Sequence, residues 1–106
     1  MNHGINISKF NQAIQLIEAK DRSDFLNLFI SELEKDINTL LNTQNLQKAK
    51  DIAHKQKSST NLLGAYTLSE MLQEIEDGGD LGEMPVLEEL ELVIRETKKQ
   101  LEKPNT

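Results

Sequence analysis

The sequence contains no cysteine and no tryptophan, and its 106 residues include only three phenylalanines and one tyrosine. Without cysteine, the chain has no disulfide, no thiolate nucleophile and no thiolate metal ligand. Because aromatic side chains are scarce, the chain lacks the stacking surfaces on which single-stranded nucleic acids bind. Its core must therefore consist mainly of leucine and isoleucine, which is typical of helical proteins.

Positive charge is also in the minority, since 12 lysines and arginines face 18 aspartates and glutamates, giving a net charge of -6. An acidic chain repels the phosphates of nucleic acids, so we expect no nucleic-acid partner. No apolar run approaches the length of a membrane span, and Met1 to Ile7 lack the apolar core of a signal peptide. We therefore expect a cytoplasmic monomer without membrane contact.

The spacing of apolar residues predicts helices along the whole chain, and no strand pattern competes with it. A short first helix is expected between Ser8 and Ala19. Ser23 is the predicted cap of a longer second helix, and a third helix is expected over residues 46–63. Gly64 follows at the place where a left-handed C-cap is expected.

Thr67 and Glu70 match the capping-box pattern, which predicts that a fourth helix starts there. Residues 77–80 interrupt the helical pattern, and Pro85 indicates the start of a last helix. We expect the acidic side chains near the start of this helix to be solvated: Glu88, Glu89 and Glu91. Amphipathic helices joined by short turns pack as antiparallel neighbours. We predict an all-α fold, an antiparallel four-helix bundle with a short additional N-terminal helix across one end. It forms a single domain over residues 1–106, with an ordered core of about 8–103.

The third predicted helix carries the residues of chemical interest. On a helical wheel at roughly 100° per residue, its core stripe consists of Ala49, Ala53, Gln56, Thr60 and Leu63. His54 lies outside this stripe, and the neighbouring turns of the same exposed face carry Lys50, Lys57, Ser58 and Asn61. An imidazole is a good nucleophile, and Lys57, one turn further along, is well placed to reach a phosphoryl group carried by the ring.

The segment from Leu46 to Leu63 is also a basic island on an acidic protein. It holds four lysines and one aspartate, a local net charge of +3. Such a patch attracts an acidic partner. An exposed histidine on a helix is most often an ordinary solvated side chain, so the surrounding string decides how His54 is interpreted.

That string, AHKQKSSTNLLGA from Ala53 to Ala65, resembles the signature of histidine-containing phosphotransfer (HPt) domains, the relay modules of multistep phosphorelays. In this family the phosphorylated histidine is followed at +3 by lysine, at +4 usually by glycine, at +5 by a small residue and at +10 by glycine, often with alanine next. The corresponding residues here are Lys57, Ser58, Ser59, Gly64 and Ala65. The family's bundle order also matches the predicted helices, so the resemblance covers nearly the whole chain.

The resemblance implies that His54 accepts a phosphoryl group on Nε2 and that Lys57 stabilises it. Lys50, Ser58 and Asn61 share the exposed face and are expected to contact the partner. That partner would be the receiver domain of a response regulator, with a hybrid sensor kinase as a second one. The Mg²⁺ ion belongs to the receiver, so this chain needs no cofactor. It would act as a phosphoryl carrier without kinase activity of its own.

Two residues depart from the family pattern. Ser58 replaces the usual glycine, so its hydroxymethyl group either alters docking or hydrogen-bonds the imidazole or its phosphate. Gln56 replaces an aliphatic residue on the core stripe, and a buried amide requires a hydrogen-bond partner or a position near the bundle rim.

Two other functions remain open from the sequence. The first is a helical-bundle interaction module that docks a receiver or kinase without accepting phosphate, and the change at Ser58 is its main support. The second is a small metal-binding bundle, for which the chain offers only His3 and His54 and no Glu-x-x-His pattern.

Overall fold

The computed structural model describes residues 4–79 and 82–102, and within these ranges the only regular secondary structure is helical. The elements are α1 (Ile7–Ile14), a 3-10 turn η1 (Ala19–Asp21), α2 (Arg22–Asn42), α3 (Leu46–Leu62), α4 (Tyr66–Glu76) and α5 (Glu83–Glu102). The predicted all-α fold is confirmed. Residue 103, the predicted end of the ordered core, and His3 lie outside the described residues.

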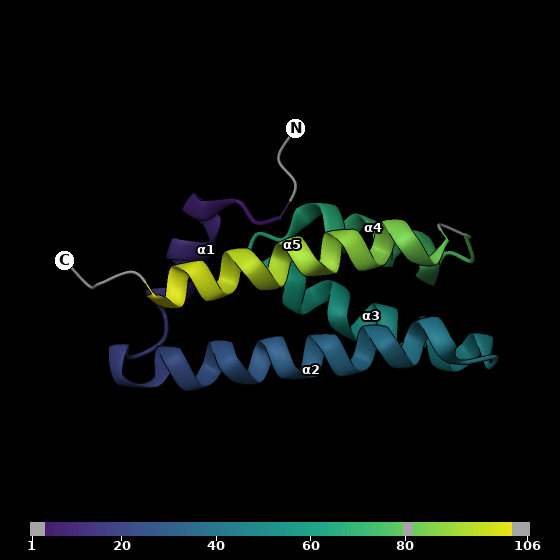
Figure 1. Ribbon diagram of the computed structural model, residues 1–106, viewed down its shortest axis with the longest axis horizontal. Coiled ribbons are helices and arrows are strands. Elements are labelled where there is room, and N and C mark those ends of the chain that lie inside the picture. The colour runs from purple at the N-terminus through teal and green to yellow at the C-terminus, as the bar shows by residue number, and fades with distance from the viewer. Residues whose placement is uncertain (1–3, 80–81, 103–106) are drawn as a thin grey trace.

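The four longer helices form the bundle, and α1 covers one end of it (Figure 1). The long helices α2 and α5 run in opposite directions, while α3 and α4 form a helical hairpin (Figure 1). α3 packs most extensively against α4 and next against α2. The helix that carries the candidate histidine therefore has a neighbouring helix on each flank.

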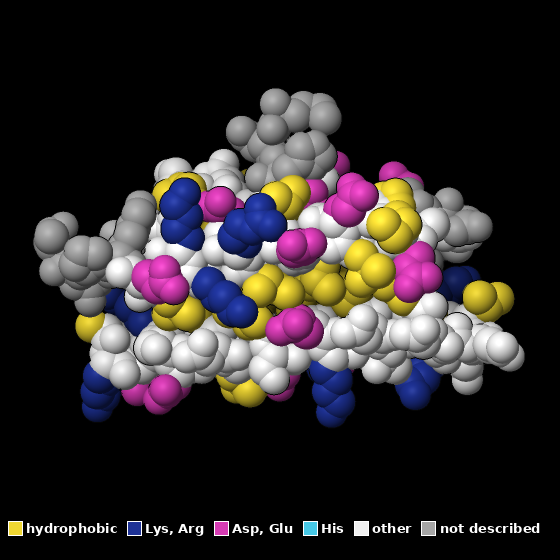
Figure 2. Space-filling model, viewed as in Figure 1, with side chains coloured by type: hydrophobic (Ala, Val, Ile, Leu, Met, Phe, Trp, Pro, Cys, Tyr) yellow, Lys and Arg dark blue, Asp and Glu magenta, His cyan; other side chains and the backbone are white. Residues whose placement is uncertain are grey.

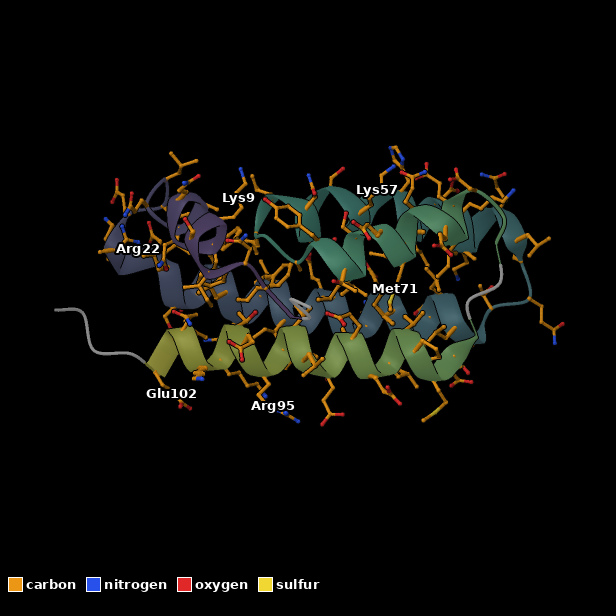
Figure 3. The ribbon with its side chains drawn as sticks, turned by 90° about the horizontal axis from the view of Figure 1, so that it is seen from above. Lys9, Arg22, Lys57, Met71, Arg95 and Glu102 are labelled. Carbon is orange, nitrogen blue, oxygen red and sulfur yellow. The ribbon has the colours of Figure 1, made fainter. Side chains whose placement is uncertain are left out.

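The core is filled by leucine, isoleucine and valine, as the scarcity of aromatic residues requires. The largest fully buried hydrophobic side chains are Leu33 and Ile37 of α2, Leu68 and Leu72 of α4, and Val86 and Val93 of α5. Each such side chain stabilises the fold by about 1.5–3 kcal/mol relative to an exposed position. Met71 points into the bundle and Arg95 away from it (Figure 3). Along the seam between α2 and α5, hydrophobic side chains reach the surface among charged ones (Figure 2).

The first helix is shorter than predicted, because α1 ends at Ile14 rather than near Ala19. The side chain of Arg22 explains this early end. Its Nε donates hydrogen bonds to the carbonyl oxygens of Ile14 and Ile17 at 3.0 and 2.9 Å. A guanidinium group thus satisfies carbonyls that a longer helix would have bonded internally.

Two predicted helix caps were wrong. α2 begins at Arg22 and not after Ser23, because the turn η1 leads directly into it and the Arg22 N–H already bonds the carbonyl of Ala19. α4 begins at Tyr66, before Thr67, and its N-cap residue is Ala65, whose side chain makes no capping hydrogen bond. At α2, the backbone of the preceding turn supplies the start that a side-chain cap was expected to supply.

Glu89 was expected to be solvated but is only 2% exposed. Its Oε2 accepts a hydrogen bond of 2.6 Å from the backbone N–H of Gly4. Ile5 is buried next to it, and the N–H of Asn6 donates to the carbonyl of Gly64 at 2.9 Å. The segment before α1 is therefore fixed to α5 at one end and to the end of α3 at the other.

Gly64 ends α3 in the left-handed conformation, with φ of +83°, as predicted. A Cβ atom at this position would lie only 2.9 Å from the carbonyl oxygen of Asn6. Glycine is thus required both by its backbone angle and by the close approach of the N-terminal segment. The chain reverses here and leads directly into α4, which places α3 and α4 side by side.

Candidate functional site

His54 lies on the outward face of α3. Asn45 caps this helix by accepting the Lys48 N–H at 3.1 Å. The predicted core stripe is confirmed at Ala53, Gln56, Thr60 and Leu63, which are at most 3% exposed. Burial of that stripe fixes the rotation of the helix, so the side chain of His54 points outward and is 67% exposed.

The residue that contacts the imidazole is Glu76, near the end of α4. Its Oε2 lies 2.7 Å from His54 Nδ1, and its Oε1 lies 2.6 Å from Lys57 Nζ. The Glu76 side chain is 25% exposed. One carboxylate therefore bridges the candidate histidine and the candidate lysine.

The charge state of Glu76 determines what this bridge does. The hydrogen bond from Lys57 lowers the pKa of Glu76, partial burial opposes this, and the bond to His54 lowers the pKa further, so the net shift is downward. Glu76 is thus ionised near neutral pH, and an ionised carboxylate can only accept hydrogen bonds. The hydrogen on the neutral imidazole must therefore be on Nδ1, which donates it to Glu76. The free electron pair is left on Nε2.

Nε2 has no hydrogen-bond partner in the part of the chain that the structure describes. A basic nitrogen with its lone pair directed toward solvent is the form in which imidazole acts as a nucleophile. A carboxylate that orients an imidazole and stabilises its positive charge is a recurring catalytic arrangement. The contact with Glu76 therefore gives His54 a defined reactive atom.

The carboxylate of Glu76 holds the ammonium group of Lys57 near Nδ1 of the ring, because it binds both groups. Lys57 is only 24% exposed, and its Nζ also donates to Gln73 Oε1 at 2.8 Å. An ammonium group has three N–H donors, so one remains unused among the described residues. Lys57 can donate this third hydrogen without breaking the bonds that hold it.

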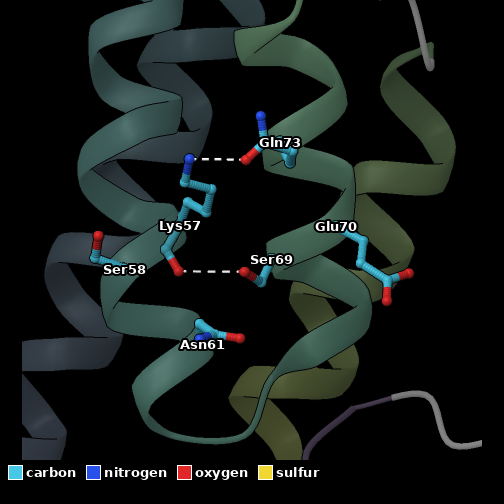
Figure 4. Close-up of a pocket in the computed structure, with 6 residues that line it drawn as sticks. All are labelled: Lys57, Ser58, Asn61, Ser69, Glu70 and Gln73. Carbon is cyan, nitrogen blue, oxygen red and sulfur yellow. Dashed lines mark hydrogen bonds between the residues drawn. The ribbon is translucent and has the colours of Figure 1, made fainter.

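The predicted partner-binding residues are brought together only in part. A groove of about 360 Å³ runs between α3 and α4, and its lining residues are Lys57, Ser58, Asn61, Ser69, Glu70 and Gln73 (Figure 4). Its floor is fixed by the Lys57 bond to Gln73 and by the Ser69 hydroxyl, which donates to the Lys57 carbonyl at 3.2 Å. Lys50 is half-buried and does not line the groove.

Ser58 and Asn61 are exposed and contribute to one wall of this groove. Within the described residues, the Ser58 hydroxyl makes no hydrogen bond to the imidazole. An influence on docking and a hydrogen bond to the phosphate both stay predictions for this side chain.

On the other flank of α3, the buried amide of Gln56 has the partner that the sequence required. Gln56 Nε2 donates to Asp36 Oδ2 of α2 at 2.6 Å, and Lys55 Nζ bonds the same oxygen at 3.0 Å. Burial raises the pKa of Asp36, but these two hydrogen bonds and the charges of Lys55 and Lys35 together outweigh it and hold the pKa below its ordinary value. α3 is thus bound by a carboxylate on each side, Asp36 of α2 and Glu76 of α4.

These carboxylates change the predicted basic patch. The sequence places four lysines and one aspartate on the segment from Leu46 to Leu63. In the fold, Lys55 pairs with Asp36 and Lys57 with Glu76. The local excess of positive charge is therefore smaller than α3 alone predicts.

We expect Asp36→Asn to lower the free energy of unfolding by about 1–3 kcal/mol at neutral pH, because the buried Gln56 amide loses its charged acceptor. The pKa of Asp36 is lower in the folded protein than in the unfolded chain. The ionised carboxylate of Asp36 therefore stabilises the fold fully above the unfolded-state pKa. This stabilisation is lost as the pH falls through the folded-state pKa. The difference between the two proteins should therefore shrink in acid. Urea unfolding of both proteins near pH 7 and near pH 3 measures it.

Glu34→Gln is the matched control, since Glu34 is an exposed carboxylate on the same helix. We expect it to change stability by no more than about 0.5 kcal/mol. An equal loss for Asp36→Asn at both pH values would mean that the charge of Asp36 does not stabilise the fold.

The sequence predicted His54 and Lys57 as candidate residues but gave no role to Glu76 and Gln73, which bind them in the structure. The contacts of Glu76 and Gln73 could have been predicted from the residue spacing in the expected hairpin of the third and fourth helices. His54 and Glu76 stand at equal distances along the chain from Ala65, and so do Lys57 and Gln73. Ala65 lies at the reversal between two antiparallel helices. The two residues of each pair are therefore expected to lie side by side, at the same level along the helix axes.

Comparison with protein families decides what kind of domain this is. The family model described as Hpt domain matches residues 24–102, most of the chain. The chain belongs to the Hpt domain family. Searches among curated proteins and among solved structures gave no match. Hpt domains are phosphocarriers of two-component signalling rather than enzymes, and their helical bundle agrees with the observed fold.

Two further observations concern the surface of this Hpt domain. Over residues 4–79 and 82–102, no three histidine, aspartate or glutamate side chains form a group that could hold a metal ion. Within the same ranges, no helix combines the length and the apolar character needed to cross a membrane.

Proposed function

We propose that this Hpt domain carries a phosphoryl group on Nε2 of His54 and exchanges it with the aspartate of a response-regulator receiver domain. The observation that carries the proposal is the 2.7 Å contact between His54 Nδ1 and the ionised Glu76. It leaves Nε2 as an exposed nucleophile in a fixed orientation. A module used only for docking would have no need of a bridged histidine, carboxylate and lysine.

Phosphoryl transfer proceeds through a loose transition state in which the attacking and leaving atoms are in line, so positioning and charge are the main requirements. The His54 Nε2 electron pair attacks phosphorus while the bond from phosphorus to the aspartyl oxygen breaks, which returns an electron pair to that oxygen. The imidazole becomes positively charged, and Glu76 stabilises this charge through Nδ1–H. Transfer back to the receiver follows the same path in reverse.

Lys57 stabilises the phosphoryl oxygens in this scheme. Its two bonds to Glu76 and Gln73 hold the ammonium group near the ring, and its third N–H is available for a phosphoryl oxygen. The partner supplies the Mg²⁺ ion and the aspartate. Ser58 and Asn61 lie on the exposed side of α3 and would contact the receiver, together with the half-buried Lys50. A hybrid sensor kinase carrying such a receiver would be a second partner.

The direct test uses a receiver domain that has been charged with a small acyl phosphate. After mixing, we expect label on this chain that is lost in acid and retained in alkali, as a phosphoramidate bond requires. An aspartyl phosphate behaves in the opposite way in alkali, so the two proteins are distinguished. Absence of alkali-stable label on the chain with every receiver tested would contradict the proposal.

We expect Lys57→Ala to slow transfer from the receiver by about tenfold to a hundredfold, the effect of losing one charge-assisted hydrogen bond. The helix content should be unchanged, because Lys57 lies outside the core stripe. Stopped-flow or quench-flow transfer kinetics and circular dichroism measure the two effects. Lys48→Ala removes the same charge from an exposed position of α3 and should transfer at the normal rate. Equal rates for both variants would remove Lys57 from the mechanism.

A further inference from the structure

The two oxygens of Glu76 are both in use, one on His54 Nδ1 and one on Lys57 Nζ. Nε2, where the proposed function places the phosphoryl group, is the other ring nitrogen, separated from Nδ1 by one carbon atom. The carboxylate therefore remains in contact with Nδ1 when Nε2 is occupied. A negative charge at this distance favours a proton on the ring nitrogen beside it.

That proton controls how easily a phosphoryl group leaves an imidazole. When the bond between phosphorus and Nε2 breaks, its electron pair returns to Nε2. If Nδ1 carries a proton, the leaving group is neutral imidazole. If Nδ1 is bare, the leaving group is the imidazolate anion, which is far more basic and leaves far more slowly.

We infer that Glu76 is a positioning residue that keeps the phosphoryl group on His54 labile, so that this domain is built to pass the group on quickly and not to store it. The inference rests on the proposed function and concerns the lifetime of the phosphorylated state. In the loss to water, the water oxygen attacks phosphorus, the bond to Nε2 breaks, and orthophosphate leaves. The proton stays on Nδ1, hydrogen-bonded to Glu76, so the group that leaves is neutral imidazole, and the water proton passes to solvent.

Glu76 is the group that can exert this effect, because the other charges nearby are bound elsewhere or do not contact the ring. Besides Glu76, the charged residues of α3 and α4 are Lys48, Lys50, Asp51, Lys55, Lys57, Glu70 and Glu74, Asp77 follows α4 directly, and α2 contributes Asp36, which binds α3. Asp77 accepts a hydrogen bond from Gln73, and Asp36 is bound by Gln56 and Lys55. Within the described residues, Glu76 alone contacts the imidazole.

The experiment needs no receiver. Potassium phosphoramidate phosphorylates the protein directly, since its own bond between phosphorus and nitrogen breaks, a bond from Nε2 to phosphorus forms, and ammonia leaves. After the donor is removed, the decay of the phosphohistidine signal is followed by ³¹P NMR from about pH 6 to about pH 9. The signal that is absent in His54→Gln is assigned to His54.

We expect Glu76→Gln to decay about tenfold more slowly than the natural protein at the alkaline end, with a steeper slowing as the pH rises. The amide can still accept the bond from Lys57, so the helix hairpin should be preserved. Glu74→Gln, which removes the same charge from an exposed position of α4, should decay at the natural rate with the natural pH profile.

Equal decay rates and equal pH profiles for the natural protein and Glu76→Gln would overturn the inference and leave the proposed phosphoacceptor intact. A Glu76→Gln domain that accepts no phosphoryl group from phosphoramidate would also overturn it, because Glu76 would then be needed to load the group onto His54 and not to release it. Absence of any His54 signal in the natural protein would overturn the proposed function as well.

Discussion

Replacing His54 by glutamine should abolish the acid-labile, alkali-stable label that the chain acquires from a phosphorylated receiver. Glutamine is similar in size to histidine but has no nucleophilic nitrogen, and the side chain of His54 is 67% exposed. The substitution therefore removes the reactive atom with little effect on packing. The measurement is the amount of alkali-stable label on the chain after mixing with a charged receiver, and we expect it to fall to background.

Two observations make this result interpretable. The thermal midpoint and helix content of His54→Gln should stay close to those of the natural protein, because exposed substitutions usually change stability by no more than about 0.5 kcal/mol. The unlabelled receiver should also still bind, since Ser58 and Asn61 are retained. Undiminished label in the variant would place the phosphoryl group on another residue.

Replacing Gly64 by alanine should lower the free energy of unfolding by about 2 kcal/mol or more. A residue with a side chain loses about 1–2 kcal/mol in the left-handed conformation, and Gly64 has φ of +83°. In addition, the new Cβ would lie 2.9 Å from the Asn6 carbonyl oxygen and 3.1 Å from Lys9 Cβ. Urea unfolding followed by circular dichroism measures the loss.

Gly78→Ala separates the two contributions. Gly78 has a similar φ of +89°, but a Cβ there would meet nothing within 4 Å. Its replacement should therefore lower stability only by the conformational part, about 1–2 kcal/mol. A loss at Gly64 no larger than that at Gly78 would mean that the N-terminal segment can move away from the end of α3 without penalty.

The arrangement of helices was predictable because it depends on periodicity. Apolar residues at helical spacing bury one face, and short connections make neighbouring helices antiparallel. The predicted starts and ends were less accurate because they depend on local competition for backbone groups. Arg22 ended α1 early from a position eight residues further along the chain, and the turn before α2 replaced the expected cap at Ser23.

Burial of charged residues was another point where the sequence misled. Glu89 stands among other glutamates near the start of α5, and nothing in its spacing separates it from a solvated neighbour. Its burial depends on Gly4, which is distant in the chain and brings an N–H to its carboxylate. A contact between such distant residues forms only when the whole bundle has assembled.

The sequence by itself determined that His54 faces outward on a helix and that Lys57 is its neighbour, because both follow from the fixed geometry of one helix. It also determined the resemblance to the HPt signature, which the family match over residues 24–102 bears out. Only the tertiary structure decided which nitrogen of the imidazole is free. That depends on Glu76, a residue of a different helix that the reversal at Gly64 brings within 2.7 Å of the ring.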